Sequence, residues 1–358
     1  MKKSLIALAV LGAFTGSAFA ADNVQLYGII DLGVAHYSNG NGSVTKLGTG
    51  IQSGSRIGLK GTEDLGGGLS ALFQAETGFC ANGGTANGAA SGLAAGGYCT
   101  GGGFMQRTAI VGLKGDFGTM VAGRMYTLTF NDQAAVDPFG YGLNGTISNI
   151  GTIGAPARVS QAVAYVSPNF SGFNFAGAYV FGDGLGLTTA TTTHTTGAYN
   201  LHAGYNNGPL MVGLDYLRAN NTAGNATVKH TMLFGTYDLG VAKLAGMYAQ
   251  NKPDAAAGGG NFQAWMLGGT VPVGPGAILL SYTQAKNKDV SETTSKQVAI
   301  GYTYALSKRT NLYTSYAHIS NQSGVFAAVQ DAPGNNDAPA GGLGMSSSGF
   351  ALGIRHQF

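Results

Sequence analysis

The chain has 358 residues, of which only 10% are charged, and its formal net charge is +3. Soluble domains carry about 25% charged residues, so this composition argues against an ordinary water-facing surface, and the small net charge gives no support for nucleic-acid binding. After residue 20 no segment reaches 18 consecutive apolar residues, which excludes membrane-spanning helices. A membrane protein without them must be a closed β-barrel, because only closure pairs every backbone group in hydrocarbon.

The first twenty residues predict a cleaved signal peptide. Lys2 and Lys3 form a positive start, residues 5–14 are a short apolar run, and Ala-Phe-Ala at 18–20 is a small-x-small cleavage site. An uncleaved anchor is the alternative, but the run is short and no stop-transfer charges follow it. We therefore expect export through the Sec pathway. The mature chain, 21–358, keeps 17 of the 19 Lys and Arg against 16 Asp and Glu, a net charge of +1.

Apolar residues alternate with polar or small ones through most of the mature chain, as in strands with one apolar face. Helical periodicity has one possible place, 128–145. Most of the predicted strands are long enough for a tilted strand that crosses a bilayer, which takes about 9–11 residues. The predicted strands are 23–37, 50–61, 68–79, 104–115, 118–127, 157–167, 172–182, 196–207, 209–220, 228–239, 241–250, 261–273, 276–287, 295–306, 311–320 and 347–358.

The connections between these strands alternate in length. Tight turns rich in Gly, Asn, Asp and Pro lie at 115–118, 206–209, 238–240 and 272–276. Long polar loops lie near 38–49, 80–103, 128–156, 183–195, 221–227, 251–260, 288–294 and 321–346. Short periplasmic turns and long external loops are typical of an outer-membrane barrel. A soluble sandwich or solenoid is the alternative, but a sandwich would expose more charge, and no fixed repeat occurs.

Cys80 and Cys99 are the only cysteines, and both lie in a Gly- and Ala-rich stretch. In an oxidising periplasm such a pair predicts a disulfide. Two free thiols or half of a metal site are the alternatives, and the lack of nearby ligand spacing argues against metal. Glycine clusters such as 66–68 precede no helix that could cradle a phosphate. No cofactor and no metal site are therefore expected.

Several segments in order resemble trimeric general porins of Gram-negative β-proteobacteria over the full mature length. They are VQLYGIID at 24–31, SRIGLKGTEDLG at 55–66, RTAIVGLKG at 107–115, SQAVAYVSP at 160–168 and GIRHQF at 353–358. The resemblance implies an all-β, sixteen-stranded up-and-down antiparallel barrel, a homotrimer in contact with outer-membrane lipid and lipopolysaccharide, and a third loop, 128–156, folded into the lumen as a constriction. Phe358 resembles the terminal aromatic read by the barrel-assembly machinery; a girdle aromatic is the alternative.

Basic residues are expected on the lumen wall. A sixteen-stranded barrel is too wide for side chains to fill, so it holds water. Arg56 and Lys60 lie on one face of their predicted strand, opposite apolar residues, and Arg124 and Arg158 alternate likewise. The resemblance implies that Arg56, Arg107 and Arg158 form the arginine cluster found at the constriction of anion-preferring members. Arg107 shares its face with lipid-facing positions, so it needs a bulge or a place near the rim.

The acidic side of the constriction is expected on the third loop, at Asp132 and Asp137. Related porins often have a glutamate between proline and phenylalanine, whereas this chain has Asp137 before the proline. Arginines facing these carboxylates would create a field across the throat, and an excess of wall cations would favour anions. Alternatively, the arginines pair with lumen carboxylates such as Glu76 and brace the wall.

These features predict a passive diffusion channel for ions and small hydrophilic solutes, weakly anion-preferring. A substrate-specific channel for small anions shares the fold and stays open. An enzyme on a barrel is the other alternative, but the chain contains no Gly-x-Ser-x-Gly, and its six histidines form no i,i+4 pair. No catalytic residue is therefore predicted.

Overall fold

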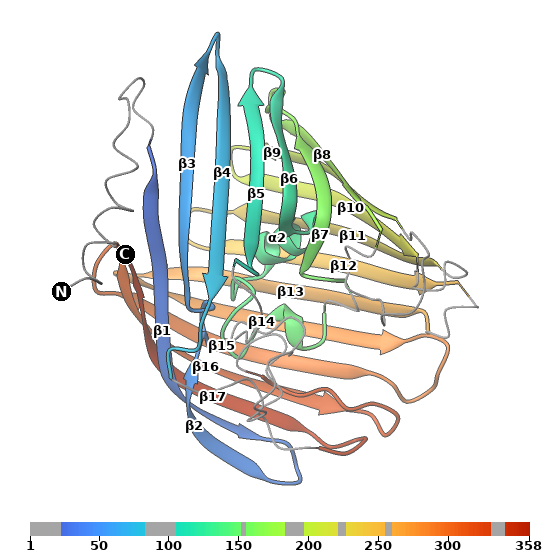
Figure 1. Cartoon of the computed structure of the whole chain (residues 1–358). Coiled ribbons are helices and arrows are strands. Elements are labelled where there is room, and N and C mark those ends of the chain that lie inside the picture. The colour runs from blue at the N-terminus through green and yellow to red at the C-terminus, as the bar shows by residue number, and fades with distance from the viewer. Residues whose placement is uncertain are drawn as a thin grey trace, which may run out of the picture.

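The computed structural model describes residues 23–82, 105–151, 155–182, 197–220, 227–254, 260–330 and 341–358. Its strands form one antiparallel sheet that closes where β1 pairs with β17, from Ile29 opposite Gln357 to Ser38 opposite Ser348 (Figure 1). The strands are β1 (Gln25–Ser38), β2 (Ser43–Thr49), β3 (Arg56–Gly66), β4 (Leu69–Gly78), β5 (Thr108–Gly115), β6 (Gly118–Tyr126), β7 (Arg158–Val166), β8 (Phe173–Val180), β9 (Ala198–Asn207), β10 (Leu210–Asn220), β11 (Thr227–Asp238), β12 (Lys243–Pro253), β13 (Phe262–Val273), β14 (Gly276–Asn287), β15 (Ser295–Ala305), β16 (Thr310–Asn321) and β17 (Ser347–Gln357).

The sheet contains seventeen strands at sixteen positions, because β2 and β3 both pair with β1 and share one position. The predicted strand at 50–61 and loop at 38–49 are therefore wrong in detail: most of that loop is strand β2. The wall is interrupted at 50–55, where Gly50 adopts a positive φ of 72°. The backbone N–H groups of Gln52 and Ser53 donate to Asp31 Oδ2 at 2.7 and 2.5 Å, which holds this segment against β1.

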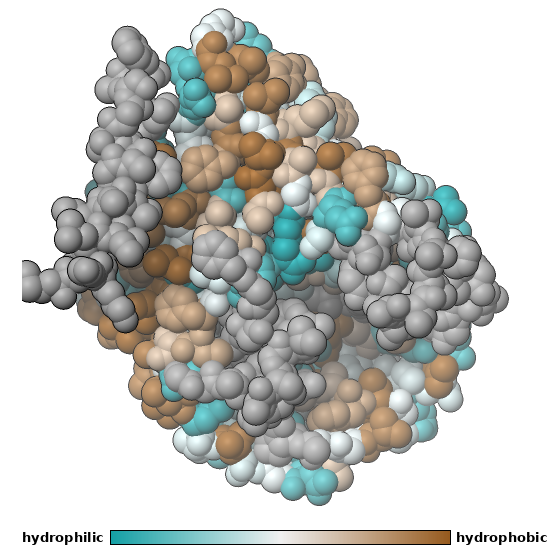
Figure 2. Space-filling model, in the orientation of Figure 1, coloured by the Kyte–Doolittle hydropathy of each residue, from teal (hydrophilic) through white to brown (hydrophobic). Residues whose placement is uncertain are grey.

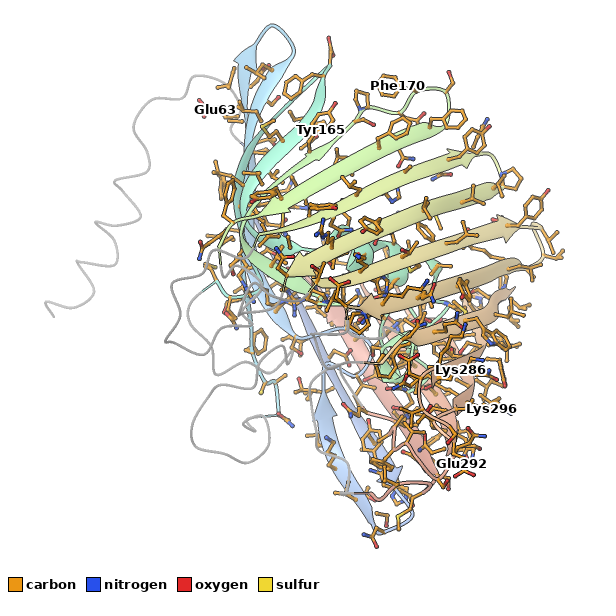
Figure 3. All side chains as sticks on the ribbon, turned by 90° about the vertical axis from the view of Figure 1, so that its right-hand side faces the viewer. Glu63, Tyr165, Phe170, Lys286, Glu292 and Lys296 are labelled. Carbon is orange, nitrogen blue, oxygen red and sulfur yellow. The ribbon has the colours of Figure 1, made fainter. Side chains whose placement is uncertain are left out.

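The four predicted tight turns are confirmed by hairpin registers. Gly115 pairs with Gly118, Asn207 with Leu210, Asp238 with Lys243, and Val273 with Gly276. These turns lie at one end of the barrel, called here the short-turn end. Figure 3 shows Glu63, Tyr165 and Phe170 toward this end and Lys286, Glu292 and Lys296 at the opposite, long-loop end.

The two faces of the wall differ as a lipid-facing barrel requires. In β15, Val298 is 58% and Ile300 51% exposed, whereas the intervening Gln297 and Ala299 are buried. Hydrophobic residues are widespread on the outer surface of the hairpins at the top of Figure 2. Within the described ranges, no helix has the length and apolar character needed to span a membrane.

The segment 128–151 folds into the interior and carries the helices α2 (Leu128–Val136) and η2 (Ile147–Asn149) (Figure 1). Thr127 is the N-cap of α2, and its hydroxyl accepts from Phe130 N at 3.0 Å. It contacts β8 to β12, where Phe130 and Val136 pack in one buried cluster with Met232 of β11 and Met247 of β12. The later part of the segment packs around Phe139 and Leu143 on the inward side of β1, β14 and β16. We call this segment the inner loop.

Candidate functional site

Three arginines and one glutamate meet on the inward face of the wall. Arg107 Nε lies 2.7 Å and Arg56 Nη1 3.7 Å from the same oxygen, Glu76 Oε1. Tyr27 donates its hydroxyl to the other oxygen, Glu76 Oε2, at 3.0 Å. Strand register explains the meeting, since Gly58 lies opposite both Tyr27 and Glu76. A Cβ at position 58 would lie 2.5 Å from the Tyr27 ring, so the tyrosine needs glycine there.

Tyr126 connects Arg107 to the third arginine. Its hydroxyl accepts from Arg107 Nη2 at 2.8 Å and also from Arg158 Nη2. The Arg158 guanidinium lies over the Tyr126 ring, 4.1 Å from its centroid. Arg56, Glu76, Arg107, Tyr126 and Arg158 therefore form one network, called here the arginine cluster. Its single carboxylate compensates one of three positive charges.

Arg107 reaches the cluster from irregular backbone. It directly precedes β5 and lies two residues after Met105, which has a φ of 60°, and its N–H donates to Glu76 O at 3.0 Å. The side chain is buried, with 1% of the residue exposed. Arg107 needs a break in alternation in order to face the lumen, and this break lies just before β5 begins.

Lys60 and Arg124 lie on opposite faces of the wall. Lys60 faces inward, with Nζ 5.4 Å from the Tyr27 ring centroid. The prediction that Arg124 faces the lumen is wrong: it shares the side of the exposed Met120 and lies opposite Ala109 on the outer face. Its guanidinium donates to Gln106 O and to Ser160 Oγ. The β5–β6 register runs without a break from Gly118 to Arg124, so regular alternation with Met120 and Ala122 already puts Arg124 on the outer face.

Two contributors to this wall were not predicted as site residues. Arg355 lies directly opposite the inward-facing Asp31, and Arg56 lies opposite Ile29, two residues away on the same strand. The alternation of 351–357 contained the signal for Arg355. Tyr126 gave no sequence signal, because its role depends on two arginines from other segments of the chain.

Asp137 organises the inner loop. Its carboxylate accepts from the backbone N–H groups of Phe139 and Ile147 at 3.0 Å and Tyr141 at 3.1 Å, and it is 5% exposed. Burial raises the pKa of this carboxyl to about 6, while the three backbone donors oppose the rise. Asp137 is the C-cap of α2, and its three backbone donors account for an acid before the proline. It does not face the arginines, in contrast to the prediction.

Asp132 is also turned away from the arginine cluster. Its Oδ2 lies 2.8 Å from His202 Nδ1 on β9, and His202 Nε2 lies 2.9 Å from Asn174 Oδ1. Burial raises the pKa of Asp132, and the hydrogen bond with His202 opposes this. Among the described residues, the carboxylate paired with Arg56 and Arg107 is Glu76. The throat thus has cations on its wall and a loop whose two acids are already engaged.

The inner loop is fixed to the wall across the barrel. Asn144 N donates to Ser315 Oγ at 3.2 Å on β16. Gln297 Nε2 on β15 donates to Gly145 O at 3.0 Å, and Thr129 donates its hydroxyl to Asp215 on β10. These contacts anchor the loop to β10, β15 and β16. At its start the loop also touches the arginine cluster, because Phe130 of α2 stacks on Tyr126 with ring centroids 4.3 Å apart.

Other predicted residues have separate places. Cys80 is disulfide-bonded, while Cys99 and the signal peptide lie outside the described residues. Phe358 exchanges backbone hydrogen bonds with Gly28 at 3.0 and 3.1 Å, which helps to close the barrel. Within the described ranges, no group of three or more His, Cys, Asp or Glu could hold a metal ion.

Comparisons with known proteins agree with this architecture. A sequence profile described as Gram-negative porin matches residues 7–324. Outer membrane porin protein 32 of Delftia acidovorans is 34% identical and an outer membrane porin protein of Bordetella pertussis 33% identical, each over 100% of both chains. The solved structure of an anion-selective porin from Comamonas acidovorans has a TM-score of 0.78 and 30% identity, covering 94% of this chain and 100% of that one.

Proposed function

We propose that this chain, which belongs to the Gram-negative porin family, owes a preference for anions to its arginine cluster. The protein is an outer-membrane porin, a passive diffusion channel for ions and small hydrophilic solutes. The observation that carries the proposal is the cluster, where Arg56 and Arg107 share Glu76 and Tyr126 joins Arg158 to Arg107. The solved relative described as anion-selective agrees with it.

The mechanism is electrostatic. A unit anion about 4 Å from one uncompensated cation gains about 1 kcal/mol even at the dielectric constant of water. That energy corresponds to about a fivefold rise in local anion concentration. The cluster brings three arginines together with one glutamate, and Lys60 adds another inward cation. Because Asp132 and Asp137 are engaged elsewhere, the loop offers cations no matching site.

The proposal includes a homotrimer in contact with lipopolysaccharide and inserted by the barrel-assembly machinery. The outer wall exposes large apolar side chains, such as Leu26 at 61% and Val111 at 63%, which require lipid or a neighbouring subunit. Phe358, which supplies the terminal aromatic for assembly, is 41% exposed at the end of β17. Deleting Phe358 should impair insertion into the outer membrane; full insertion would contradict its role as a signal.

A substrate-specific anion channel is the second candidate. The observation that favours it is the convergence of donors from Arg107 and Arg158 on Tyr126, a geometry that could also hold a phosphate or carboxylate. Block of chloride current by millimolar phosphate or succinate would favour this candidate. If phosphate or succinate only adds its own current to the chloride current, the general channel is favoured. We propose no catalytic activity, in keeping with a family of channels.

The test is ion selectivity in planar bilayers. We expect Arg56→Glu with Arg158→Glu to reverse the sign of the reversal potential in a salt gradient, because the cluster changes from excess positive to excess negative charge. The matched control is Lys308→Glu with Arg309→Glu, the same charge change in the exposed turn before β16. The control should retain anion preference. An unchanged reversal potential in the first variant would refute the proposal.

A further inference from the structure

Cations line the outer face of the wall at the long-loop end of β10 to β15. Arg218 lies directly opposite Lys229, and Lys229 lies directly opposite Lys252. Adjacent strands are about 4.8 Å apart, so three cations fall within about 10 Å of one another. Like charges in directly opposite positions destabilise a sheet. An arrangement that costs stability in isolation indicates an anionic ligand.

The same edge continues with Lys286 on β14 and Lys296 on β15, which Figure 3 shows together with Glu292. We call these five cations the rim row: Arg218, Lys229, Lys252, Lys286 and Lys296. All lie within two residues of a strand end at the long-loop side. Nearby acids compensate it only in part: Asp254 pairs with Lys229 at 3.2 Å, and Asp289 accepts from Asn261 N at 2.7 Å.

The rim row faces away from the lumen. Along β10 it continues with Leu214, 49% exposed, and along β11 with Leu233, 59% exposed. The alternate residues Asp215 and Met232 are buried against the inner loop side. The row therefore belongs to the surface that meets the membrane, not to the channel.

The side chains below the rim row are graded by polarity. Amides come first, with Gln250 opposite Gln263; aromatics follow, with Tyr248 opposite Trp265. The two layers are joined, since Gln263 Nε2 donates to the Tyr248 hydroxyl at 2.6 Å. Leu267, 61% exposed, lies next toward the middle of the wall. The order of cation, amide, aromatic and aliphatic matches a lipid from headgroup to acyl chain.

This grading is local to one side of the barrel. The outer face of β3 to β5 presents Ile57, Leu59, Phe73 and Val111, each exposed by 39% or more. The described cations of these strands, Arg56, Lys60 and Lys114, fall on the inward-facing alternation. Cations on the outer face of a barrel are expensive in contact with hydrocarbon, so their placement on β10 to β15 marks a headgroup site.

We infer that the rim row binds the phosphate groups of a phosphorylated glycolipid in the outer leaflet. Lys and Arg side chains bind phosphate through charge-assisted hydrogen bonds. The amide layer lies where the sugars of such a lipid would reach, and the aromatic and aliphatic layers lie along its acyl chains. The inference assigns a site to the lipopolysaccharide contact included in the proposed function, and it does not depend on ion selectivity.

The test uses Trp265, the only tryptophan of the chain, as a reporter. Purified full-length protein in dodecyl maltoside is titrated with bisphosphorylated lipid A while Trp265 emission is recorded. Arg218→Gln with Lys252→Gln should weaken binding by about thirtyfold, since each headgroup cation contributes about a factor of five. The matched control, Lys308→Gln with Arg309→Gln at the short-turn end, should bind like the unmodified protein. Heat-modifiable gel mobility and conductance establish that both variants are folded.

Two further arms identify the ligand. Lipid A stripped of both phosphates should bind the unmodified protein about as weakly as bisphosphorylated lipid A binds the double variant. Inorganic phosphate alone should leave Trp265 emission unchanged; a saturable response would show a free-anion site and overturn the lipid assignment. Equal lipid A affinity of the unmodified protein and the Arg218/Lys252 variant would also overturn it. Either failure, with anion-preferring conductance intact, would leave the channel proposal standing.

Discussion

The arginine wall and the inner loop use charged residues in opposite ways. On the wall, Arg56 and Arg107 share Glu76, and Arg158 donates to the neutral hydroxyl of Tyr126, so positive charge is left in excess within the cluster. On the loop, Asp137 accepts three backbone N–H groups and Asp132 pairs with His202. The charge that a permeating ion meets is therefore set by how each charge is already engaged. A mature net charge of +1 conceals this asymmetry.

Removing the carboxylate that Arg56 and Arg107 share should have the largest effect on the arginine wall. Glu76→Gln leaves Arg107, 1% exposed, without its ionic partner. Breaking a buried pair in this way costs about 3–5 kcal/mol. We expect the folded barrel to be lost at lower denaturant concentration, measured by gel mobility. The remaining folded channels should show a stronger anion preference.

Glu63→Gln is the matched control for this change. Glu63 lies exposed near the short-turn end of β3, where an isosteric loss of charge should change stability by less than about 0.5 kcal/mol. If both variants unfold at the same denaturant concentration, Glu76 does not hold the cluster together.

Titration of Asp137 gives the next largest effect. Its pKa is raised to about 6 by burial, against about 3.9 in an unfolded chain. Between these values the folded state binds more protons than the unfolded state, so the free energy of unfolding falls as pH rises from about 4 to 6. The full contribution is about 3 kcal/mol. Asp137→Asn should make this slope shallower by the contribution of one carboxyl, measured as unfolding free energy against pH.

Asp64→Asn is the control, since Asp64 is an exposed turn residue whose carboxylate accepts from Gly66 N at 2.9 Å. It should keep the slope of the unmodified protein. Parallel pH profiles for all three proteins would contradict the assignment of that slope to Asp137.

Alternation in the sequence was enough to predict a sixteen-position barrel, its tight turns and the inward side of Arg56 and Lys60. It failed where the backbone leaves the regular strand. The interruption at 50–55 depends on Asp31 capturing Gln52 and Ser53, contacts between residues about twenty apart. Arg124 was misplaced for another reason: its charge suggested the lumen, although its alternation with Met120 in the regular β5–β6 register puts it on the outer face.

The site was predictable in its residue types but not in its pairings. Arg107 was expected to need a break in alternation, and irregular backbone before β5 supplies it. The partners of Asp137 are backbone groups of its own loop, and the partner of Asp132 is His202 on β9, which also bonds Asn174 on β8. A sequence shows that a carboxylate is present; only packing shows whether its oxygens are available to an ion.

The smallest expected effect tests the hydroxyl that joins two arginines. Tyr126→Phe keeps the ring under Arg158 but removes the acceptor shared with Arg107. Losing such a bond costs about 1–2 kcal/mol, while Arg107 keeps Glu76. We expect anion preference to persist and single-channel current noise to rise, because Arg158 becomes less restrained. Tyr165→Phe, which removes a hydroxyl that donates to Phe117 O on the outer face, should change neither. A loss of anion preference in Tyr126→Phe would mean that the position of Arg158, and not the charge excess alone, determines selectivity.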